Sequence, residues 1–194
     1  MFAERKLRKV LLKSLPIETD RLLIRHISSS DADDMYEYAS TEEVCRYLLW
    51  SPHLNKDVTR GYIEYLETRY LKGLYADWAV VLKEENKMIG TCGYASVNSK
   101  ERTCEIGYVL SQKYRKKGYM SEALNAVLAL SFETLAFERA DLRIISENTE
   151  SRNLAERNGF SLERVCEKEM EIKGEYCDIA HYSMTKERYF DIKK

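Results

Sequence analysis

The sequence predicts a mixed α/β domain in which a mostly antiparallel sheet is flanked by helices. Residues 78–110 contain three strand-like segments joined by short turns, a pattern typical of an antiparallel meander. A strand, a helix and a further strand follow between residues 104 and 145, and this order requires a locally parallel pair. The chain then ends in a predicted hairpin around Lys173 and Gly174.

The first part of the chain carries one expected strand and three expected helices. Residues 21–27 (RLLIRHI) are largely aliphatic and predict a strand, and residues 28–31 (SSSD) offer N-cap residues for the helix that follows. A second, short helix is expected at residues 41–48. Residues 55–71 form a third helix, because apolar or aromatic side chains recur there at a helical spacing, at Val58, Tyr62, Leu66 and Tyr70.

In the rest of the chain the spacing of apolar residues alternates between that of strands and that of helices. A helix is expected to begin at Gly118 with a buried apolar stripe. A shorter helix spans residues 151–158 and is closed by Gly159, which suits the left-handed position after a helix. Apolar and β-branched runs predict strands at 78–82, 88–94, 103–110, 142–145, 170–172 and 179–184.

The composition of the 194-residue chain fits one folded domain with a short extension. Hydrophobic residues make up 44% and charged residues 32%, which excludes a disordered chain. The net charge of −1 gives no global attraction to nucleic acid or to an anionic membrane, so neither is expected as a partner. No apolar run is long enough to span a bilayer. Residues 1–16 form a basic, amphipathic N-terminal extension, and a short surface helix explains it better than a targeting segment.

The cysteines and histidines give no metal-binding or disulfide pattern. The five cysteines are odd in number and contain no C-x-x-C pair, which argues against a disulfide framework and against a zinc site. His26, His53 and His181 lie far apart in the sequence. We therefore expect no metal and a cytoplasmic location.

The segment most informative about chemistry lies between strand 103–110 and the helix that begins at Gly118. The turn carries four cationic side chains, and free N–H groups at a helix start form an anion site together with the helix dipole. Glycine lets the backbone approach the anion closely. A pyrophosphate suits such a site, although on these grounds alone an ordinary solvated turn is an equal alternative. The four cations are Lys113, Arg115, Lys116 and Lys117.

The same segment resembles a known family. Arg115-x-x-Gly118-x-Met120 is similar to the R/Q-x-x-G-x-G/A pyrophosphate loop of the GCN5-related N-acetyltransferases (GNATs). The whole chain resembles the branch of that family that includes the ribosomal-protein-alanine N-acetyltransferases. The resemblance runs from about residue 17 to residue 185, so we assign a GNAT domain to 17–185 and a C-terminal tail to 186–194. The matching segments are ETDRLLIR (18–25), YLLW (47–50), EIGYVL (105–110), KGYMSEAL (117–124), ENTES (147–151), NGF (158–160) and GEYCD (174–178).

The resemblance implies the fold and the position of the cosubstrate. It implies a GNAT fold whose parallel strands splay apart, with acetyl-CoA in the V-shaped gap. The pantetheine is expected to bond backbone near Tyr108, Val109 and Leu110. Asn148 is expected to bond it as well, with termination of its strand as the alternative role. The pyrophosphate is expected to meet N–H groups of Arg115, Lys116, Lys117, Gly118, Tyr119, Met120 and Ser121, where Met120 departs from the usual glycine or alanine.

The resemblance also implies the catalytic residues. Glu105 is the candidate general base, acting through water beside the thioester, with an ordinary solvated strand carboxylate as the alternative. Ser151 holds the position that donates a hydrogen bond to the leaving sulfur, with helix N-capping as the alternative. Ala155 stands where many relatives carry a tyrosine acid. The developing oxyanion is expected to meet a backbone N–H near Leu110.

These residues lead to a functional hypothesis: transfer of acetyl from acetyl-CoA to a primary amine. The expected acceptor is the N-terminal α-amine of a peptide or protein, or a small amine. Trp50 and Trp78 are tentative lining residues of the acceptor pocket, with core packing as the equal alternative. A non-catalytic acyl-CoA-binding sensor or scaffold is the competing hypothesis. Relatives are often dimers, so a homodimer is a further expectation.

Overall fold

The computed structural model describes residues 10–11, 13–72, 74 and 76–194. Within these residues, eight strands form one sheet in the order β1-β2-β3-β4-β5-β6-β8-β7. Neighbouring strands are antiparallel except for β5 and β6, which are parallel. The predicted mixed α/β fold with one parallel pair is confirmed. The strands are β1 (Ile17–Glu18), β2 (Leu22–Arg25), β3 (Asp77–Leu82), β4 (Lys87–Asn98), β5 (Thr103–Leu110), β6 (Arg139–Ile145), β7 (Ser161–Ile172) and β8 (Glu175–Thr185).

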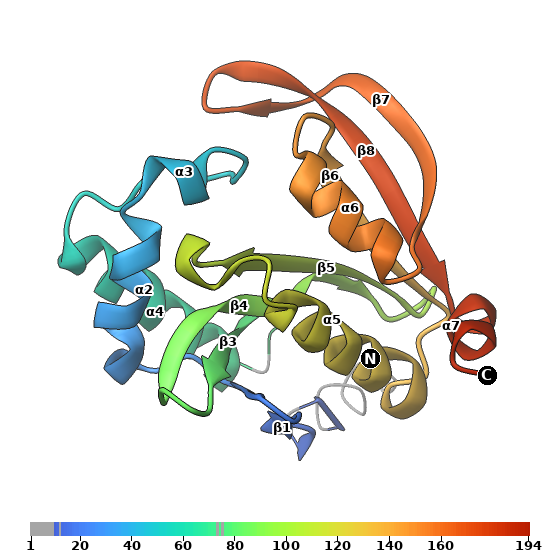
Figure 1. Ribbon diagram of the computed structural model, residues 1–194, viewed down its shortest axis with the longest axis horizontal. Coiled ribbons are helices and arrows are strands. Elements are labelled where there is room, and N and C mark those ends of the chain that lie inside the picture. The colour runs from blue at the N-terminus through green and yellow to red at the C-terminus, as the bar shows by residue number, and fades with distance from the viewer. Residues whose placement is uncertain (1–9, 12, 73, 75) are drawn as a thin grey trace.

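Helices flank this sheet, with α2, α3 and α4 gathered at one end of the molecule, on the left in Figure 1. Helix α5 crosses the strands β4 and β5, and the long β7–β8 hairpin arches above α6 in the same view (Figure 1). None of the helices in the described part of the chain has the length and apolar content needed to cross a membrane. The helices are η1 (Ser29–Asp31), α2 (Ala32–Ala39), α3 (Glu42–Cys45), α4 (Lys56–Leu71), η2 (Gln112–Tyr114), α5 (Tyr119–Ala129), η3 (Leu130–Thr134), α6 (Thr149–Arg157) and α7 (Lys186–Ile192).

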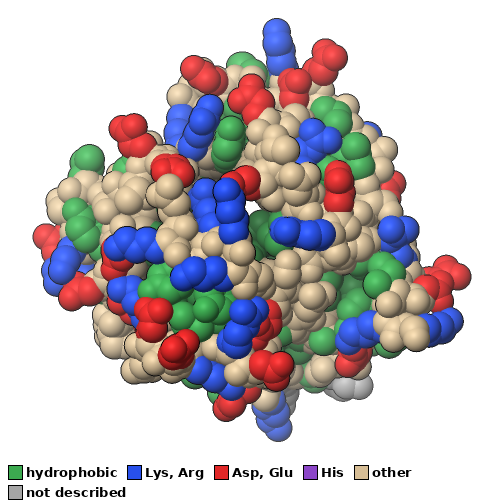
Figure 2. All heavy atoms as spheres, in the orientation of Figure 1, with side chains coloured by type: hydrophobic (Ala, Val, Ile, Leu, Met, Phe, Trp, Pro, Cys, Tyr) green, Lys and Arg blue, Asp and Glu red, His purple; other side chains and the backbone are tan. Residues whose placement is uncertain are grey.

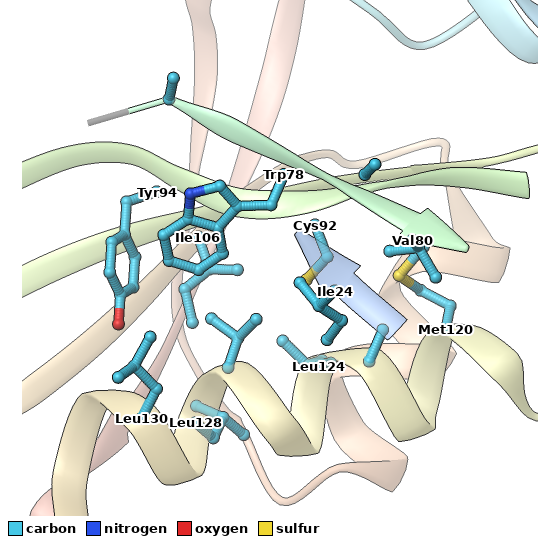
Figure 3. Close-up of a cluster of buried hydrophobic side chains, with 14 of the residues drawn as sticks. Ile24, Trp78, Val80, Cys92, Tyr94, Ile106, Met120, Leu124, Leu128 and Leu130 are labelled. Atoms are coloured by element: carbon cyan, nitrogen blue, oxygen red, sulfur yellow. The ribbon is translucent and has the colours of Figure 1, made fainter. Parts of the chain in front are cut away.

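The main core lies between α5 and the central strands. Alternation along each strand sends every second side chain toward α5, where it meets the apolar stripe of that helix (Figure 3). The contacting side chains are less than one-tenth exposed, so their burial contributes much of the driving force for folding. They include Ile24, Trp78, Val80, Cys92, Tyr94 and Ile106 from the strands and Met120, Leu124 and Leu128 from α5.

The parallel pair separates after three residues. Strands β5 and β6 are paired only from Thr103↔Arg139 to Glu105↔Asp141, although β5 continues to Leu110 and β6 to Ile145. The edge of β5 beyond Glu105 therefore has no strand ladder on the β6 side. Half of the backbone N–H and C=O groups of such a segment point toward the gap. The chain thus forms the splayed pair that the resemblance implied.

Several predicted elements differ from the structure in length. Strands β4 and β6, expected at 88–94 and 142–145, span Lys87–Asn98 and Arg139–Ile145. The second helix, expected to reach Leu48, ends at Cys45, and residues 46–50 form turns. The closing hairpin is much longer than expected, because β7 already begins at Ser161. Residues 161–169 are largely polar and exposed, as suits an edge strand, so they carry no apolar alternation that the sequence could reveal.

Helix α7 and the first described residues of the chain pack against the domain. Residues 186–192, expected as a tail, form helix α7, and the ring of Tyr189 from this helix contacts that of Phe132 in a tilted arrangement, with centroids 4.9 Å apart. The surface helix expected over residues 1–15 falls largely outside the described residues. Of the described part, Val10, Leu11 and Lys13 are helical, and Leu11 is buried in the core.

Candidate active site

The turn before α5 has the backbone geometry of an anion-binding site. Gly118 is the N-cap of α5 with φ of +82°, a left-handed conformation that favours glycine, and Lys116 is also left-handed with φ of +61°. No side chain of the described residues caps this helix. The N–H groups of Tyr119, Met120 and Ser121 are the ones that lack acceptors within an α-helix. They point, with the positive end of the helix dipole, out of the N-terminus.

The turn is held in place by the residues that precede β2. Glu122 Oε1 accepts hydrogen bonds from Thr19 Oγ1 (2.6 Å) and from the Arg21 backbone N–H (2.9 Å). The Arg21 side chain pairs with Glu122 Oε2 at 2.6 Å, donates to the carbonyl of Lys117 at 3.0 Å and lies over the ring of Tyr119. Burial alone raises the pKa of Glu122, but the hydrogen bonds from Thr19 and Arg21 outweigh it and lower that pKa. The carboxylate therefore stays charged and fixes the loop.

Only part of the positive charge of the loop is available to a ligand. Two of its four cations are neutralised by carboxylates of other elements, in the pairs Lys113–Glu37 and Arg115–Glu150, the latter with Nη1 3.1 Å from Oε2. Within the described part of the chain, Lys116 and Lys117 form no ion pair, and Lys117 Nζ lies 5.4 Å from the ring centroid of Tyr114. Figure 2 shows a hollow near the centre of this face, with Lys and Arg side chains around it.

The two residues that follow the loop have structural side chains. Met120, which departs from the family pattern, turns its side chain into the core beside Val80 and is 5% exposed (Figure 3). It can therefore offer its backbone N–H without placing a thioether at the anion site. Ser121 Oγ accepts a hydrogen bond from Asn158 Nδ2 at 3.1 Å, which ties the start of α5 to the end of α6.

The segment expected to hold the pantetheine lies on the open edge of β5. Tyr108, Val109 and Leu110 pair with β4 on one side, opposite Cys92, Thr91 and Gly90 in turn. On the other side they face the gap left by β6. Gly90 is required here, because a Cβ at that position would lie 2.2 Å from the carbonyl oxygen of Val109.

Glu105 lies where the gap closes, on the last residue that pairs with β6. Its Oε1 is 2.9 Å from Arg143 Nε, and the carboxylate is partly exposed in a polar cavity of about 220 Å³. Arg139, Asp141 and His181 also line this cavity. Since side chains alternate along a strand, Glu105 projects from the face opposite to Cys104, Ile106 and Tyr108. Farther along β5, Val109 projects from this same face and lines a pocket with residues of α2 and α4.

Ser151 lies across the gap and is not an N-cap, so the capping role that the sequence offered as an alternative is wrong. The N-cap of α6 is Asn148, whose Oδ1 accepts from the Ser151 backbone N–H at 3.2 Å. The Ser151 hydroxyl is instead 2.8 Å from the Tyr108 hydroxyl. Burial raises the pKa of Tyr108 far above its usual value, so this phenol stays protonated. Sequence reasoning considered Tyr108 only for its backbone and missed its side chain.

The two tryptophans occupy different environments. Trp78 is 2% exposed, packs edge-to-face on Tyr94 in the core beside α5 and does not line the pocket that Trp50 lines (Figure 3). Trp78 is therefore a core residue, as the alternative interpretation of the sequence had it. Neighbouring side chains of a strand point to opposite faces, so Asp77 faces the Trp50 side of the sheet and Trp78 faces α5. Trp50 lines a cavity of about 110 Å³ that we call the Trp50 pocket, with Tyr38, His53, Tyr62, Asp77 and Val109.

One cluster brings together residues that are distant in the sequence. Ligand atoms of Cys166, Glu169 and His181 lie within 4.8 Å of one another, because a bulge in β7 between residues 166 and 170 turns two of them toward β8. His181 Nε2 and Glu169 Oε2 are 2.5 Å apart, and this bond lowers the pKa of Glu169. The spacing of the three histidines could not reveal this group, because its other two members are a cysteine and a glutamate.

Comparison with known proteins places this geometry in a family. The model of the acetyltransferase (GNAT) domain matches residues 21–161. An uncharacterized N-acetyltransferase p20 of Bacillus licheniformis is 29% identical over 88% of this chain and 96% of its own length. The [ribosomal protein uS5]-alanine N-acetyltransferase of Escherichia coli is 25% identical over 84% of this chain and 86% of its own.

Solved structures agree in fold. A GNAT-family acetyltransferase from Bacillus anthracis superposes with a TM-score of 0.79 at 29% identity, covering 88% of this chain and 98% of that one. A microcin C7 self-immunity acetyltransferase in complex with acetyl-CoA and AMP has a TM-score of 0.78 at 21% identity, covering 86% and 93%. The family match covers more than half of the chain and includes the loop, the splayed strand and Ser151. The chain therefore belongs to the GNAT family of acetyltransferases and is an acetyl-CoA-dependent N-acetyltransferase.

Proposed function

We propose that the chain transfers acetyl to the N-terminal α-amine of a peptide or protein, or to a small amine that resembles it. The observation that carries the proposal is the placement of two polar groups on opposite faces of β5. Glu105 projects from the same face of β5 as Val109, into a cavity lined by strand residues, whereas Tyr108 projects from the other face and meets Ser151. An amine that approaches on the Glu105 face would find a base there. A thiolate that leaves on the Tyr108 face would find a hydrogen-bond donor in Ser151.

The cosubstrate in this proposal lies along the open edge of β5. Its pyrophosphate is bound by the backbone N–H groups of Arg115 to Ser121, with charge from Lys116 and Lys117, and its pantetheine bonds the backbone of Tyr108, Val109 and Leu110. Asn148 acts indirectly, as the cap that orients α6 and Ser151. The site of transfer is then close to Tyr108, within reach of both faces of the strand.

Glu105 is the base that receives the proton of the amine, through a water molecule. Oε1 of Glu105 is engaged by Arg143, which leaves Oε2 for that water. Ser151 donates a hydrogen bond to the sulfur as negative charge develops there, and Tyr108 orients the Ser151 hydroxyl. Because the phenol holds its proton firmly, Tyr108 positions Ser151 and does not act as the acid.

The choice of an α-amine follows from its acidity. An α-amine has a pKa of about 7.7–8.0 and a lysine side chain about 10.4 in model peptides. A sizeable fraction of α-amine is therefore neutral near neutral pH, and a water-relayed carboxylate suffices as base. The relative from Escherichia coli is a ribosomal protein uS5-alanine N-acetyltransferase, which by its name acts on an alanine of a protein. Trp50 and the β7–β8 hairpin border the acceptor side, where Lys173 Nζ donates to the carbonyl of Cys45 at 2.6 Å.

A competition assay tests this proposal. Acetyl-CoA is offered with a short peptide carrying a free N-terminus, the same peptide N-blocked but containing lysine, spermidine and an aminoglycoside. We expect the free N-terminus to be acetylated first, as measured by mass spectrometry and thiol release. A preference for the blocked lysine peptide or for spermidine would contradict the acceptor assignment. Binding of acetyl-CoA without thiol release from any amine would instead support a sensor or scaffold.

A further inference from the structure

The Trp50 pocket contains polar groups that the transfer chemistry does not use. Asp77 keeps partial access to solvent at the pocket, and its Oδ2 accepts a hydrogen bond from the Tyr62 hydroxyl at 3.1 Å. The hydroxyl of Tyr38 is shielded from solvent and has no hydrogen-bond partner among the described residues, although Tyr38 lines the same pocket. Buried polar groups normally find partners, so the Tyr38 hydroxyl indicates that a ligand in this pocket would offer it one.

The charge of the pocket favours a cation. Burial raises the pKa of Asp77, whereas the hydrogen bond from Tyr62 and the positive charge of Arg69 act to lower it. No ion pair to Asp77 is present within the described part of the chain, so a bound cation would be the group that stabilises its charged form. His53 is held by Thr59 Oγ1 at 2.8 Å, and burial lowers the pKa of this imidazole, so it is neutral near pH 7. An anion in the pocket would meet the Asp77 carboxylate, which forms no ion pair among the residues that the structure describes. Charge complementarity therefore favours a cationic ligand over an anionic one.

The walls of the pocket also suit a cation. Trp50 and His53 lie with ring centroids 5.0 Å apart, and His53 and Tyr62 with centroids 6.3 Å apart. Aromatic faces attract an ammonium or guanidinium group, most strongly when water is excluded. Burial raises the pKa values of Tyr38 and Tyr62, so both hydroxyls stay neutral and offer oxygen lone pairs to a donor.

The position of Asp77 decides which part of the acceptor it can reach. Asp77 is opposite Gly93 on β4, and Gly93 is opposite Gly107 on β5. Two strand spacings separate Asp77 from β5, a distance of about 10 Å between backbones. This is too far for Asp77 to take a proton from the reacting amine. The pocket nevertheless reaches Val109 on β5, so one molecule can span both positions.

We propose that the Trp50 pocket binds a second, positively charged group of the acceptor, an ammonium or guanidinium, through Asp77 and the hydroxyls of Tyr38 and Tyr62. The inference rests on the proposed function, since it assumes that the reacting amine lies at β5. It narrows the substrate class to amines with a second cationic group within about 10 Å of the reacting nitrogen. A peptide whose first residue is basic and a small diamine share this chemistry.

Two pairs of acceptors, each with one charged and one uncharged member, test the proposal. The first is a peptide with arginine as its free N-terminal residue against the same peptide with citrulline, which has the same shape without the charge. The second is agmatine against pentylamine. We expect wild-type kcat/KM to favour the charged member by about tenfold or more, which is about 1.4 kcal/mol. A preference within the peptide pair alone identifies a peptide acceptor, and one within the small-amine pair alone identifies a diamine.

Asp77→Asn should abolish that preference and leave kcat/KM for citrulline peptide or pentylamine nearly unchanged. Tyr38→Phe, which removes only the unpartnered hydroxyl, should weaken the preference by a smaller factor and guards against poor folding of the first variant. Asp191→Asn on α7 is the charge-matched control and should keep the full preference. A wild-type enzyme indifferent to charge, or a preference that survives both pocket variants, would overturn the inference.

A binding measurement separates this inference from the proposed function. Agmatine is titrated calorimetrically into wild-type protein and Asp77→Asn without acetyl-CoA. We expect about tenfold weaker binding to the variant. If no α-amine is acetylated yet agmatine binding depends on Asp77, the acceptor assignment fails and the cation site stands. Equal binding to both proteins would refute the cation site by itself.

Discussion

At the scale of single residues, the pair Tyr108 and Ser151 is the feature that the structure adds to the sequence. The family resemblance predicted the role of Ser151 but not its contact with Tyr108. The two residues are 43 positions apart in the sequence and meet only across the gap between β5 and β6. The same applies to Asp77, Tyr38 and Tyr62, which come from three elements. Side-chain partnerships of this kind depend on how the sheet splays, which no local pattern encodes.

The Ser151 hydroxyl should contribute to turnover without contributing to the cap of α6. Ser151→Ala should lower kcat by about 10- to 100-fold, the range expected for one hydrogen bond to a charged group. Its thermal stability should change little, because Asn148 remains as cap. Tyr108→Phe should lower kcat less, since it removes only the group that orients Ser151. Thiol release at saturating substrates measures both effects, and full activity of both variants would mean that water alone serves the sulfur.

At the scale of elements, the strongest predictions came from segments whose local signals agree. Strand β5 was expected at 103–110 and has those bounds, because apolar residues alternate there between two turns. Helix α5 begins one residue after the glycine that predicted it. Strand β7 was missed over residues 161–169 because an exposed edge strand has no apolar face. Of the four cationic side chains expected in the loop, two are paired with carboxylates on α2 and α6, which leaves two for a ligand. Only the tertiary structure brings these carboxylates close.

The loop before α5 should determine the affinity for acetyl-CoA. Gly118→Asp places a carboxylate on a left-handed backbone at the expected phosphate position, and we expect at least about tenfold weaker binding by calorimetry, or about 1.4 kcal/mol. Gly174→Asp is the matched control, because Gly174 has φ of +86° and open space around its Cβ position in the β7–β8 turn. The Gly174→Asp variant should carry a similar backbone strain but bind acetyl-CoA as tightly as the wild type. Equal losses in the two variants would attribute the effect to folding.

The junction between β2 and α2 should depend on a carboxylate. Asp31 is 3% exposed and binds Arg25 through both oxygens, each 2.7 Å from a guanidinium nitrogen. Burial alone raises the pKa of Asp31, but Arg25 and Ser28 outweigh it and lower that pKa. The stabilisation is therefore present above the unfolded-state pKa of about 3.9 and is lost as pH falls below it.

Asp31→Asn should cost about 1–3 kcal/mol in urea unfolding at pH 7, and the difference from wild type should shrink toward pH 3. Asp57→Asn removes an exposed pair with Arg60 and should cost much less at either pH. A deficit for Asp31→Asn that is independent of pH would show that its contribution comes from packing and not from its charge.

At the scale of the whole molecule, the fold works by separating two strands that begin as neighbours. The ladder between β5 and β6 stops at Glu105, and the open edge beyond it lies between the α2–α4 side and α6. The sequence predicted a parallel pair, because a strand–helix–strand order demands one, and the resemblance implied the splay. The point at which pairing stops is set by packing of α5, α6 and the β7–β8 hairpin, so the sequence alone could not locate it.

The central claim is that β5 presents a base for the amine on one face and a donor for the sulfur on the other. The most direct test is the pH dependence of kcat for Glu105→Gln relative to wild type, with a free N-terminal peptide as acceptor. Asp141→Asn, which changes the same charge in the same cavity, serves as control. We expect Glu105→Gln to be slower by about 10²–10⁴-fold at neutral pH and the deficit to shrink as rising pH deprotonates the amine. A deficit that stays constant with pH, or no deficit at all, would contradict the role of Glu105 as base.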